Sequence, residues 1–358
     1  MKSLTIDLLS LAAAAAVVSA CFNMKISELK AVPDLAYAKG VSAPFCGVVQ
    51  DALVVAGGAN FPDKPLLEGG QKRVYADIWV KAPGFWKSWK RAGHLPDSTA
   101  YGATFQLGDA LVLAGGNAAG QTTDKVYELR ISYGRAVLRT LPQLPVPLEQ
   151  AGWTRDGNRL FLAGGTSGPA GSAAVYTCIA DDYRWTHLLD LPEPLVQPVA
   201  FAAENMLYVW GGFNPVTLEV SDRGWCINLD EAFSGAGTWR EAPSVPDGGS
   251  FVGAAGATLP DCRLVVVGGV NREIFARALH NTPEDRISYL SQKPSDYRFR
   301  QAVYLFDPAT EEWNLVGSAP PCALAGPGLA VRKAYDIYVV GGELKPGVRS
   351  PKIFELKW

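Results

Sequence analysis

The hydrophobic pattern of this chain repeats six times. Each copy is a short aliphatic or aromatic run that ends in a glycine pair, and the copies are LVVAGG ending at Gly58, LVLAGG at Gly116, LFLAGG at Gly165, LYVWGG at Gly212, LVVVGG at Gly269 and IYVVGG at Gly342. Runs of this length without polar alternation predict strands that are buried on both faces. The glycine pair permits positive φ and a close approach of another backbone. We therefore expect six similar structural units.

The segments around each run predict further strands. Upstream lies a small apolar segment that ends in a polar turn, as in GVVQDA, ATFQLGDA, WTRDGNR and AFAAENM. This pattern is typical of a hairpin whose turn is built from Asp, Asn and Gly. Downstream comes an aromatic strand, as in DIWV, KVYELRI and QAVYLFD, and in most copies a Trp and then a Pro follow it. Glycine pair, aromatic strand and Trp in this order resemble the Kelch motif.

The two ends of the chain predict how the ring of units closes. The sixth copy stops at Trp358, one strand short, while the N-terminal segment ISELKAVPDL has the pattern of an outer strand. We expect an all-β fold over residues 25–358, a six-bladed Kelch-type β-propeller whose last blade is completed by the N-terminal strand. Such closure leaves only short strand edges exposed. The longest insertion follows Gly269, and the spacing of apolar residues in NREIFARAL predicts a short helix over one face.

The first 21 residues predict an export signal rather than part of the fold. They carry one Lys, then an apolar Leu/Ala/Val run, then small residues before Cys21. The tetrad VSAC also resembles a bacterial lipobox, in which the cysteine becomes a lipidated first residue. We expect a periplasmic protein, with a lipid anchor at Cys21 as one form of it. The alternative is a start site assigned too far upstream.

The composition and charge of the chain exclude several classes of function. The chain is 48% hydrophobic and 19% charged, with 37 Gly and 25 Pro, which suits short buried strands and tight turns. A formal net charge of -2 without blocks of like charge excludes the basic footprint of a nucleic-acid binder. The six cysteines match no CxxC motif and the three histidines are far apart. We expect no metal and no cofactor.

The loops after the glycine pairs are the expected site, because in a propeller they meet at one end of the central channel. Four of the six loops bring an asparagine there, among them Asn60 and Asn271. Amides bind hydroxyl groups as donors and as acceptors, so a polyhydroxylated ligand suits this ring. The alternative for each asparagine is that of an ordinary turn residue.

Glu343 is the strongest candidate for catalysis. It follows a buried strand and the last glycine pair, where a carboxylate loses hydration, as general acid/base chemistry needs. Arg349 lies on the same loop, in GGELKPGVRS, and a guanidinium can hold a substrate carboxylate bidentately. The alternative is that the two side chains pair with each other and tie a long loop.

Taken together, these motifs resemble those of a known family, the bacterial N-acetylneuraminate epimerases or sialic acid mutarotases, in their cyclically permuted group. The resemblance covers nearly all of the expected propeller, in the segments GGVNREIF, PSDYRFRQAVYLFDPATEEW, GGELKPGVRSPKIFEL, GGANFPDKPLLEGGQKRVYADIWV and AYGATFQLGDALVLAGGNAAG. It implies conversion of the α-anomer of the sugar acid into the β-anomer, by ring opening and reclosure.

The resemblance also assigns roles to residues. The family's proposed proton acceptor falls on Glu343, and its substrate-binding arginine falls on Arg349. We expect Asn60, Asn271 and Arg272 to contact substrate hydroxyl or carboxylate groups. Arg73 is a second candidate for the carboxylate, and the alternative for it is an ordinary surface position.

Other functions remain open on the sequence. The first rival is a non-catalytic Kelch module that binds a protein or a glycan, because the fold alone does not decide function. The second is a mutarotase for another sugar. A sialidase is disfavoured because S-x-D-x-G-x-x-W boxes are absent, and copper chemistry is disfavoured by the histidine positions.

Overall fold

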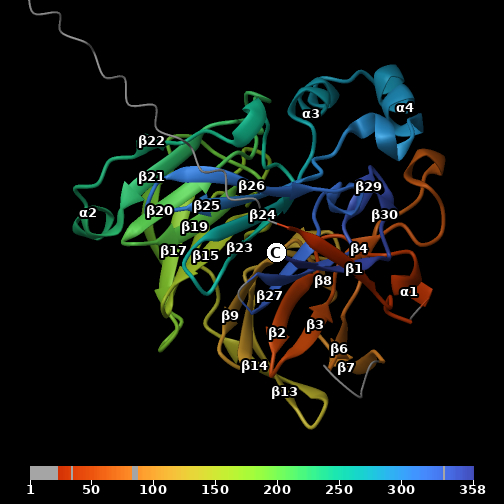
Figure 1. Ribbon diagram of the computed structural model, residues 1–358, viewed down its shortest axis with the longest axis horizontal. Helices are drawn as coiled ribbons and strands as arrows, with labels where there is room; N and C mark the ends of the chain where they lie inside the picture. The colour runs from red at the N-terminus through yellow and green to blue at the C-terminus, as the bar shows by residue number, and fades with distance from the viewer. Residues whose placement is uncertain (1–22, 34, 83–87, 334) are drawn as a thin grey trace, which may run out of the picture.

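The computed structural model describes residues 23–33, 35–82, 88–333 and 335–358. The expected signal segment and Cys21 lie outside these residues. The described part of the chain is all-β, and its main elements are four-stranded antiparallel sheets (Figure 1). Its helices are α1 (Leu35–Ala38), α2 (Leu229–Ser234), α3 (Arg272–Leu279) and α4 (Pro283–Ser291), with the 3-10 turns η1 (Leu66–Glu68), η2 (Pro246–Gly248), η3 (Pro294–Tyr297) and η4 (Pro320–Cys322). None of the helices in the described residues is long and apolar enough to cross a membrane.

Six sheets of four strands are present in the described residues, and the strand order of each runs from its innermost strand outward. The first sheet contains β2 (Phe45–Val49), β3 (Ala52–Ala56), β6 (Asp77–Lys81) and β7 (Lys90–His94). The second contains β9 (Ala103–Leu107), β10 (Ala110–Ala114), β13 (Val126–Ser132) and β14 (Arg135–Leu141). The third contains β15 (Gly152–Asp156), β16 (Arg159–Ala163), β17 (Ala174–Ile179) and β18 (Thr186–Asp190). The fourth sheet contains β19 (Val199–Ala203), β20 (Met206–Trp210), β21 (Gly224–Asn228) and β22 (Arg240–Ala242). The fifth contains β23 (Ala254–Thr258), β24 (Leu264–Gly268), β25 (Ala302–Asp307) and β26 (Glu312–Ser318).

The sixth sheet joins the two ends of the described chain. Its strands are β27 (Gly328–Lys333), β28 (Asp336–Val340), β31 (Ile353–Lys357) and β1 (Lys25–Leu29). β1 pairs antiparallel with β31, with Lys25 opposite Lys357 and Leu29 opposite Ile353. The N-terminal segment therefore supplies the outer strand of the last sheet, as its sequence predicted.

The repeated aliphatic runs form the second strand of every sheet, and these strands are buried as predicted. Every residue of β3, β10 and β24 is buried. The glycine pairs that follow lock each sheet to the segment leading into the next. A Cβ on Gly57 would lie 2.1 Å from the carbonyl oxygen of Thr99, and one on Gly341 would lie 2.2 Å from that of Val41. Since both glycines also have positive φ, no other residue fits without strain.

The innermost strands of the six sheets contact one another in order. Each lies beside the innermost strand of the following sheet, and β2 lies beside both β9 and β27. One residue shortly before each of these strands has left-handed backbone geometry, and the six are Ala43, Tyr101, Gln150, Gln197, Gly253 and Gly326.

These left-handed residues hydrogen-bond to one another through their backbones. The Ala43 N–H donates to Gly326 O at 2.7 Å, and the Tyr101 N–H donates to Ala43 O at 3.0 Å. The same link joins Gln150 to Tyr101 at 2.9 Å, Gln197 to Gln150 at 2.9 Å, and Gly326 to Gly253 at 2.6 Å. We call these six residues the left-handed ring.

Short hairpins extend from the ends of the second strands. They are β4 (Ala59–Asn60) with β5 (Arg73–Val74), β8 (Thr99–Ala100) with β11 (Asn117–Ala118) and β12 (Gln121–Thr122), and β29 (Glu343–Lys345) with β30 (Val348–Arg349). The insertion after Gly269 forms α3, where the sequence predicted a helix, and also α4, which it did not predict. Figure 1 shows both helices above β29 and β30.

Candidate active site

Glu343 and Arg349 lie on the hairpin that extends from the sixth sheet. In the pairing of β29 with β30, Glu343 is directly opposite Arg349. The turn between them contains Gly347, which has a φ of +83° and whose N–H donates to Glu343 Oε1 at 2.8 Å. Arg349 Nη1 donates to the same oxygen. The pairing that the sequence left open as an alternative is therefore present.

The side chain of Arg349 is buried and held by β4 and the residue that follows it, next to the first sheet. It is only 4% exposed, and its Nε donates to the Ala59 carbonyl oxygen at 3.3 Å. Its guanidinium also lies over the ring of Phe61, 5.4 Å from the ring centroid, which is a favourable cation–π distance. These contacts fix the orientation of the guanidinium. It borders a groove of about 340 Å³ that Asn60 and Phe61 also line.

Glu343 faces a cavity at the centre of the sheets. The cavity has a volume of about 130 Å³ and is lined by residues at the starts of all six innermost strands. The backbone of Glu343 pairs with that of Ala325, directly before Gly326 of the left-handed ring, with N–O distances of 2.6 and 2.9 Å. Its side chain is 26% exposed, so the carboxylate is partly desolvated and still open to a ligand.

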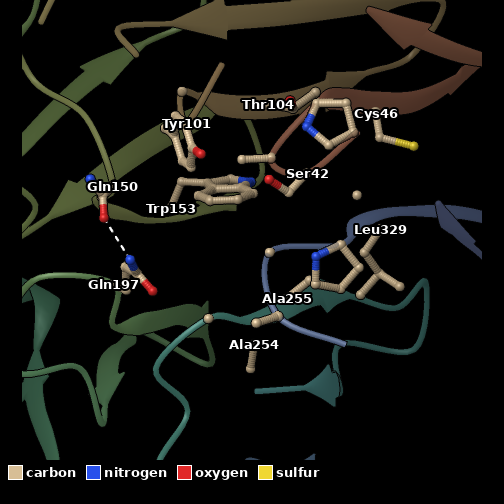
Figure 2. Close-up of a pocket in the computed structure, with 18 of the residues that line it drawn as sticks. Ser42, Cys46, Tyr101, Thr104, Gln150, Trp153, Gln197, Ala254, Ala255 and Leu329 are labelled. Atoms are coloured by element: carbon tan, nitrogen blue, oxygen red, sulfur yellow. Dashed lines mark hydrogen bonds between the residues drawn. The ribbon is translucent and has the colours of Figure 1, made fainter. Parts of the chain in front are cut away.

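The polar lining of this cavity comes mostly from residues that the sequence did not single out. Figure 2 shows Ser42, Tyr101, Gln150, Trp153 and Gln197 around it. Gln197 Nε2 donates to Gln150 Oε1 at 2.6 Å. The rest of the lining is largely small and apolar. Ser42, Tyr101, Gln150 and Gln197 precede innermost strands, whereas Trp153 lies within β15. Because these residues share no residue type, only alignment of the six repeats around these positions could have found them.

The helical insertion packs against the same hairpin. Lys345 Nζ donates to the backbone oxygens of Leu290 at 3.1 Å and Gln292 at 2.6 Å, at the C-terminal end of α4. Tyr297 of η3 is fully buried and donates its hydroxyl to the Tyr289 carbonyl oxygen. Burial, and next the charge of Glu343, raise the pKa of Tyr297. Its hydroxyl therefore keeps its proton and donates this hydrogen bond.

Asn60 lies near Arg349 but its amide is engaged within the protein. The residue is 1% exposed. Nδ2 donates to the Gly40 carbonyl oxygen at 2.8 Å, and Oδ1 accepts from the Tyr75 hydroxyl at 2.7 Å. These bonds are those of a structural asparagine that holds the first hairpin in place.

Asn271 and Arg272 lie at the start of α3, against a different cavity. Asn271 caps the helix, because its Oδ1 accepts from the Ile274 N–H at 3.0 Å. Arg272 forms an ion pair with Asp222 at 2.7 Å and donates from Nε to the Val220 carbonyl oxygen at 3.0 Å. The cavity that both line measures about 540 Å³ and does not include Glu343 or Arg349 among its lining residues.

Arg73 is an ordinary surface residue, which is the alternative that the sequence left open for it. Its side chain is 59% exposed and forms an ion pair with Asp63 at 3.6 Å. The structure thus brings Glu343, Arg349 and Asn60 into one region. It does not bring Asn271, Arg272 or Arg73 to the central cavity. Within the described residues, no group of three or more His, Cys, Asp or Glu side chains is close enough together to hold a metal ion.

Comparison with known proteins decides the family. A family model described as N-acetylneuraminate epimerase matches residues 141–357, more than half of the chain. The chain belongs to the N-acetylneuraminate epimerase family. The resemblance seen in its motifs is thereby confirmed, and the matched region of this epimerase-family chain contains Glu343, Arg349, three complete sheets and three of the four strands of the sixth.

Curated relatives give the same result. The chain is 28% identical to the N-acetylneuraminate epimerase of Yersinia enterocolitica over 238 residues, which are 61% of this chain and 59% of the relative. It is also 28% identical to that of Haemophilus influenzae strain PittEE over 236 residues, 62% of this chain and 60% of the relative. The match therefore spans about 60% of the length of these relatives.

A solved structure shares the fold. The structure titled "Structure of YjhT" superimposes with a TM-score of 0.52 at 24% sequence identity, over 60% of this chain and 64% of that one. At this identity the likeness concerns the fold alone.

Proposed function

We propose that this protein is an N-acetylneuraminate epimerase that converts the α-anomer of the sugar acid into the β-anomer. The observation that carries the proposal is the pair of Glu343 and Arg349, one facing the central cavity and the other bordering the adjoining groove. Both residues lie in the part of the chain that matches the family.

The proposed reaction opens and recloses the sugar ring. A base takes the proton of the anomeric hydroxyl, the bond from the anomeric carbon to the ring oxygen breaks, and the ring oxygen takes up a proton. The open-chain ketone then rotates and is attacked on its other face by the same oxygen, with both proton transfers reversed. The proton taken from the hydroxyl and the proton given to the ring oxygen balance, so the step needs no co-reactant beyond an acid/base group at the anomeric centre, which returns the proton itself or through water.

Glu343 is the residue we assign to the proton transfer. An ionised carboxylate accepts protons, and the Gly347 N–H and Arg349 hold one of its oxygens in place. No described residue donates a hydrogen bond to its other oxygen, which we assign to a substrate hydroxyl. Partial burial strengthens such contacts because water competes less for them.

Arg349 is the residue we assign to the substrate carboxylate. Its Nη1 contacts Glu343 and its Nε contacts the Ala59 carbonyl oxygen, so binding of a second carboxylate shares or displaces these bonds. Such sharing places the substrate carboxylate beside Glu343. Because the carboxylate of this sugar acid is attached to the anomeric carbon, the reacting centre then lies next to the base.

We also propose that the six sheets are the blades of one closed Kelch-type propeller over residues 25–358. Two observations support closure: β2 lies beside β27, and the Ala43 N–H donates to Gly326 O across the first and last sheets. We further propose a permuted order relative to the relatives. A linear comparison of permuted chains aligns only one of two segments, which accounts for matches that cover about 60% of each chain.

Export to the periplasm, with lipidation at Cys21 as one form, remains a proposal that rests on residues 1–21 alone. Cell fractionation of the full chain and of Cys21→Ser tests it. Recovery of the full chain in the cytoplasm with its N-terminal segment intact would overturn it. A shift from the membrane fraction to the soluble periplasmic fraction in the variant would establish the anchor.

The mutarotase proposal is tested by following anomer ratios with proton NMR after a sialidase releases α-N-acetylneuraminate. We expect the intact protein to accelerate appearance of the β-anomer, and Glu343→Gln to abolish the acceleration. The matched control is Glu28→Gln, on the outermost strand of the same sheet, where the carboxylate pairs with Lys352 and not with the cavity. Absence of acceleration by the intact protein would refute the proposal.

A further inference from the structure

The long polar side chains of the left-handed ring are confined to one half of it. Going round it, Tyr101, Gln150 and Gln197 carry long polar side chains, whereas the other three positions are glycine or alanine. The hairpin with Glu343 joins the small half, because Glu343 pairs with Ala325 directly before Gly326. In ring order, Gln150 stands three positions from Gly326, on the opposite side. The polar half of the ring therefore faces the carboxylate across the cavity.

The glutamines are costly residues for the backbone that they occupy. Left-handed geometry is strained for a residue with a Cβ, and such strain gathers at functional sites. Two positions of the same ring, Gly253 and Gly326, carry the residue that avoids this cost. Since the fold accepts glycine at this position, the glutamine side chains are not needed to form the turn.

Among the described residues, the two glutamine amides form a pair that leaves the NH2 group of one and the carbonyl oxygen of the other without a hydrogen bond. Gln197 Nε2 donates to Gln150 Oε1, as Figure 2 shows. Among the described residues, Gln150 Nε2 and Gln197 Oε1 have no other hydrogen-bond partner, and both side chains line the cavity. Exchange of oxygen and nitrogen in both amides would still leave one NH2 group and one carbonyl oxygen. A secondary amide, with one C=O and one N–H, is the complementary ligand.

We propose that the Gln150–Gln197 pair is the specificity subsite that binds the acylamino group of the substrate. The inference rests on the proposed function, which supplies a sugar acid with such a group. Apolar surface for the acyl methyl is present in the same cavity, which Ala151, Trp153 and Ala254 also line. Figure 2 shows Trp153 and Ala254 among the residues around it. Burial of a methyl group there adds affinity that a hydroxyl group lacks.

Equilibrium binding measured by calorimetry tests the subsite apart from catalysis. The two ligands are N-acetylneuraminate and the analogue in which a hydroxyl group replaces the acetamido group. We expect the wild-type protein to bind the acetamido sugar about tenfold more tightly, since one net hydrogen bond and a methyl contact together amount to about that factor. In Gln150→Gly and in Gln197→Gly, this preference should fall to about twofold or less.

The variants are chosen so that misfolding does not imitate the result. Glycine relieves the left-handed strain, so the melting temperatures should equal or exceed that of the wild type. The matched control is Gln50→Gly, an exposed glutamine with a φ of +49° in the turn between β2 and β3, which should keep the wild-type preference.

The outcomes separate the subsite from the catalytic proposal. An unchanged preference in both glutamine variants overturns the subsite, even if both ligands bind more weakly. A protein that binds neither sugar overturns it as well. A glutamine-dependent preference in a protein that does not accelerate mutarotation supports the subsite, while the proposed reaction fails.

Discussion

Glu343 and Arg349 are directly opposed residues of one hairpin, and the guanidinium donates a hydrogen bond to the carboxylate. The same guanidinium donates to the Ala59 carbonyl oxygen, on the loop that follows the first sheet's second strand. One side chain therefore connects the last sheet to the first and holds the candidate base. The loop-tying role and the catalytic role of this pair do not exclude each other, because a catalytic base works only if its orientation toward the substrate is fixed.

The first prediction concerns the geometry of the arginine. In Arg349→Lys, a point charge replaces a planar fork, so Glu343, the Ala59 carbonyl oxygen and a substrate carboxylate can no longer be held together. We expect kcat/KM for the sugar acid to fall at least about tenfold, a loss of about 1.4 kcal/mol of transition-state binding. The NMR assay of anomer ratios measures it.

The control for this prediction is Arg73→Lys, the same substitution at an exposed arginine. Its ion pair with Asp63 spans 3.6 Å between two exposed side chains, and such pairs contribute little. Its activity should match the wild type. Equal activity of Arg349→Lys and wild type would show that the fork geometry is not used.

The second prediction distinguishes two roles for Asn271, a helix cap and a contact with the substrate. Asn271→Ala removes the side chain that accepts from the Ile274 N–H, so we expect a loss of about 1 kcal/mol in the free energy of unfolding of the segment that holds α3. Because Asn271 lines a cavity apart from Glu343, kcat/KM should change less than twofold. Thermal unfolding and the NMR assay measure the two effects. A large fall in kcat/KM with unchanged stability would restore the substrate contact that the sequence suggested.

The asparagines illustrate what the sequence could predict. Their positions after the glycine pairs are evident from the repeat, but a turn residue and a ligand share the same composition, and only hydrogen-bond partners separate them. Asn60 bonds to Gly40 and Tyr75, and Asn271 caps α3. Glu343 stands out in the sequence because a carboxylate is rare directly after a glycine pair in this chain, where the other copies continue with apolar, Asn or Thr residues.

Gln150 and Gln197 show what the sequence could not predict. Their importance depends on a left-handed backbone and on an amide contact between two neighbouring sheets, and neither leaves a pattern along the chain. The sheets themselves were predictable because each repeated run encodes burial, which is local. The second helix of the insertion, α4, was missed because its residues are mostly exposed and so lack an apolar stripe.

The third prediction is a dependence of stability on pH. Hydrogen bonds from Arg240 and Tyr208 hold the pKa of Glu311 below its usual value, despite partial burial. A lowered pKa in the folded state contributes stability above the unfolded pKa of about 4.3, and this contribution is lost as the pH falls through the folded pKa. The melting temperature of the wild type should therefore exceed that of Glu311→Gln at pH 6, and the difference should shrink towards pH 3. A difference that stays constant with pH would contradict this account.

The fourth prediction concerns thiol reactivity. Cys46 lines the central cavity, yet burial raises the pKa of its thiol. Burial also raises the pKa of the Cys322 thiol to about 11. It is the largest cause that raises the pKa of the Cys178 thiol to about 12. Alkylation requires the thiolate, so these residues should stay unmodified by iodoacetamide at pH 8, whereas the exposed Cys262 reacts. Peptide mapping by mass spectrometry distinguishes them, and a sample unfolded in guanidinium chloride, in which every thiol should react, is the control. Modification of Cys46 as fast as Cys262 in the folded protein would mean that the cavity opens to bulk solvent.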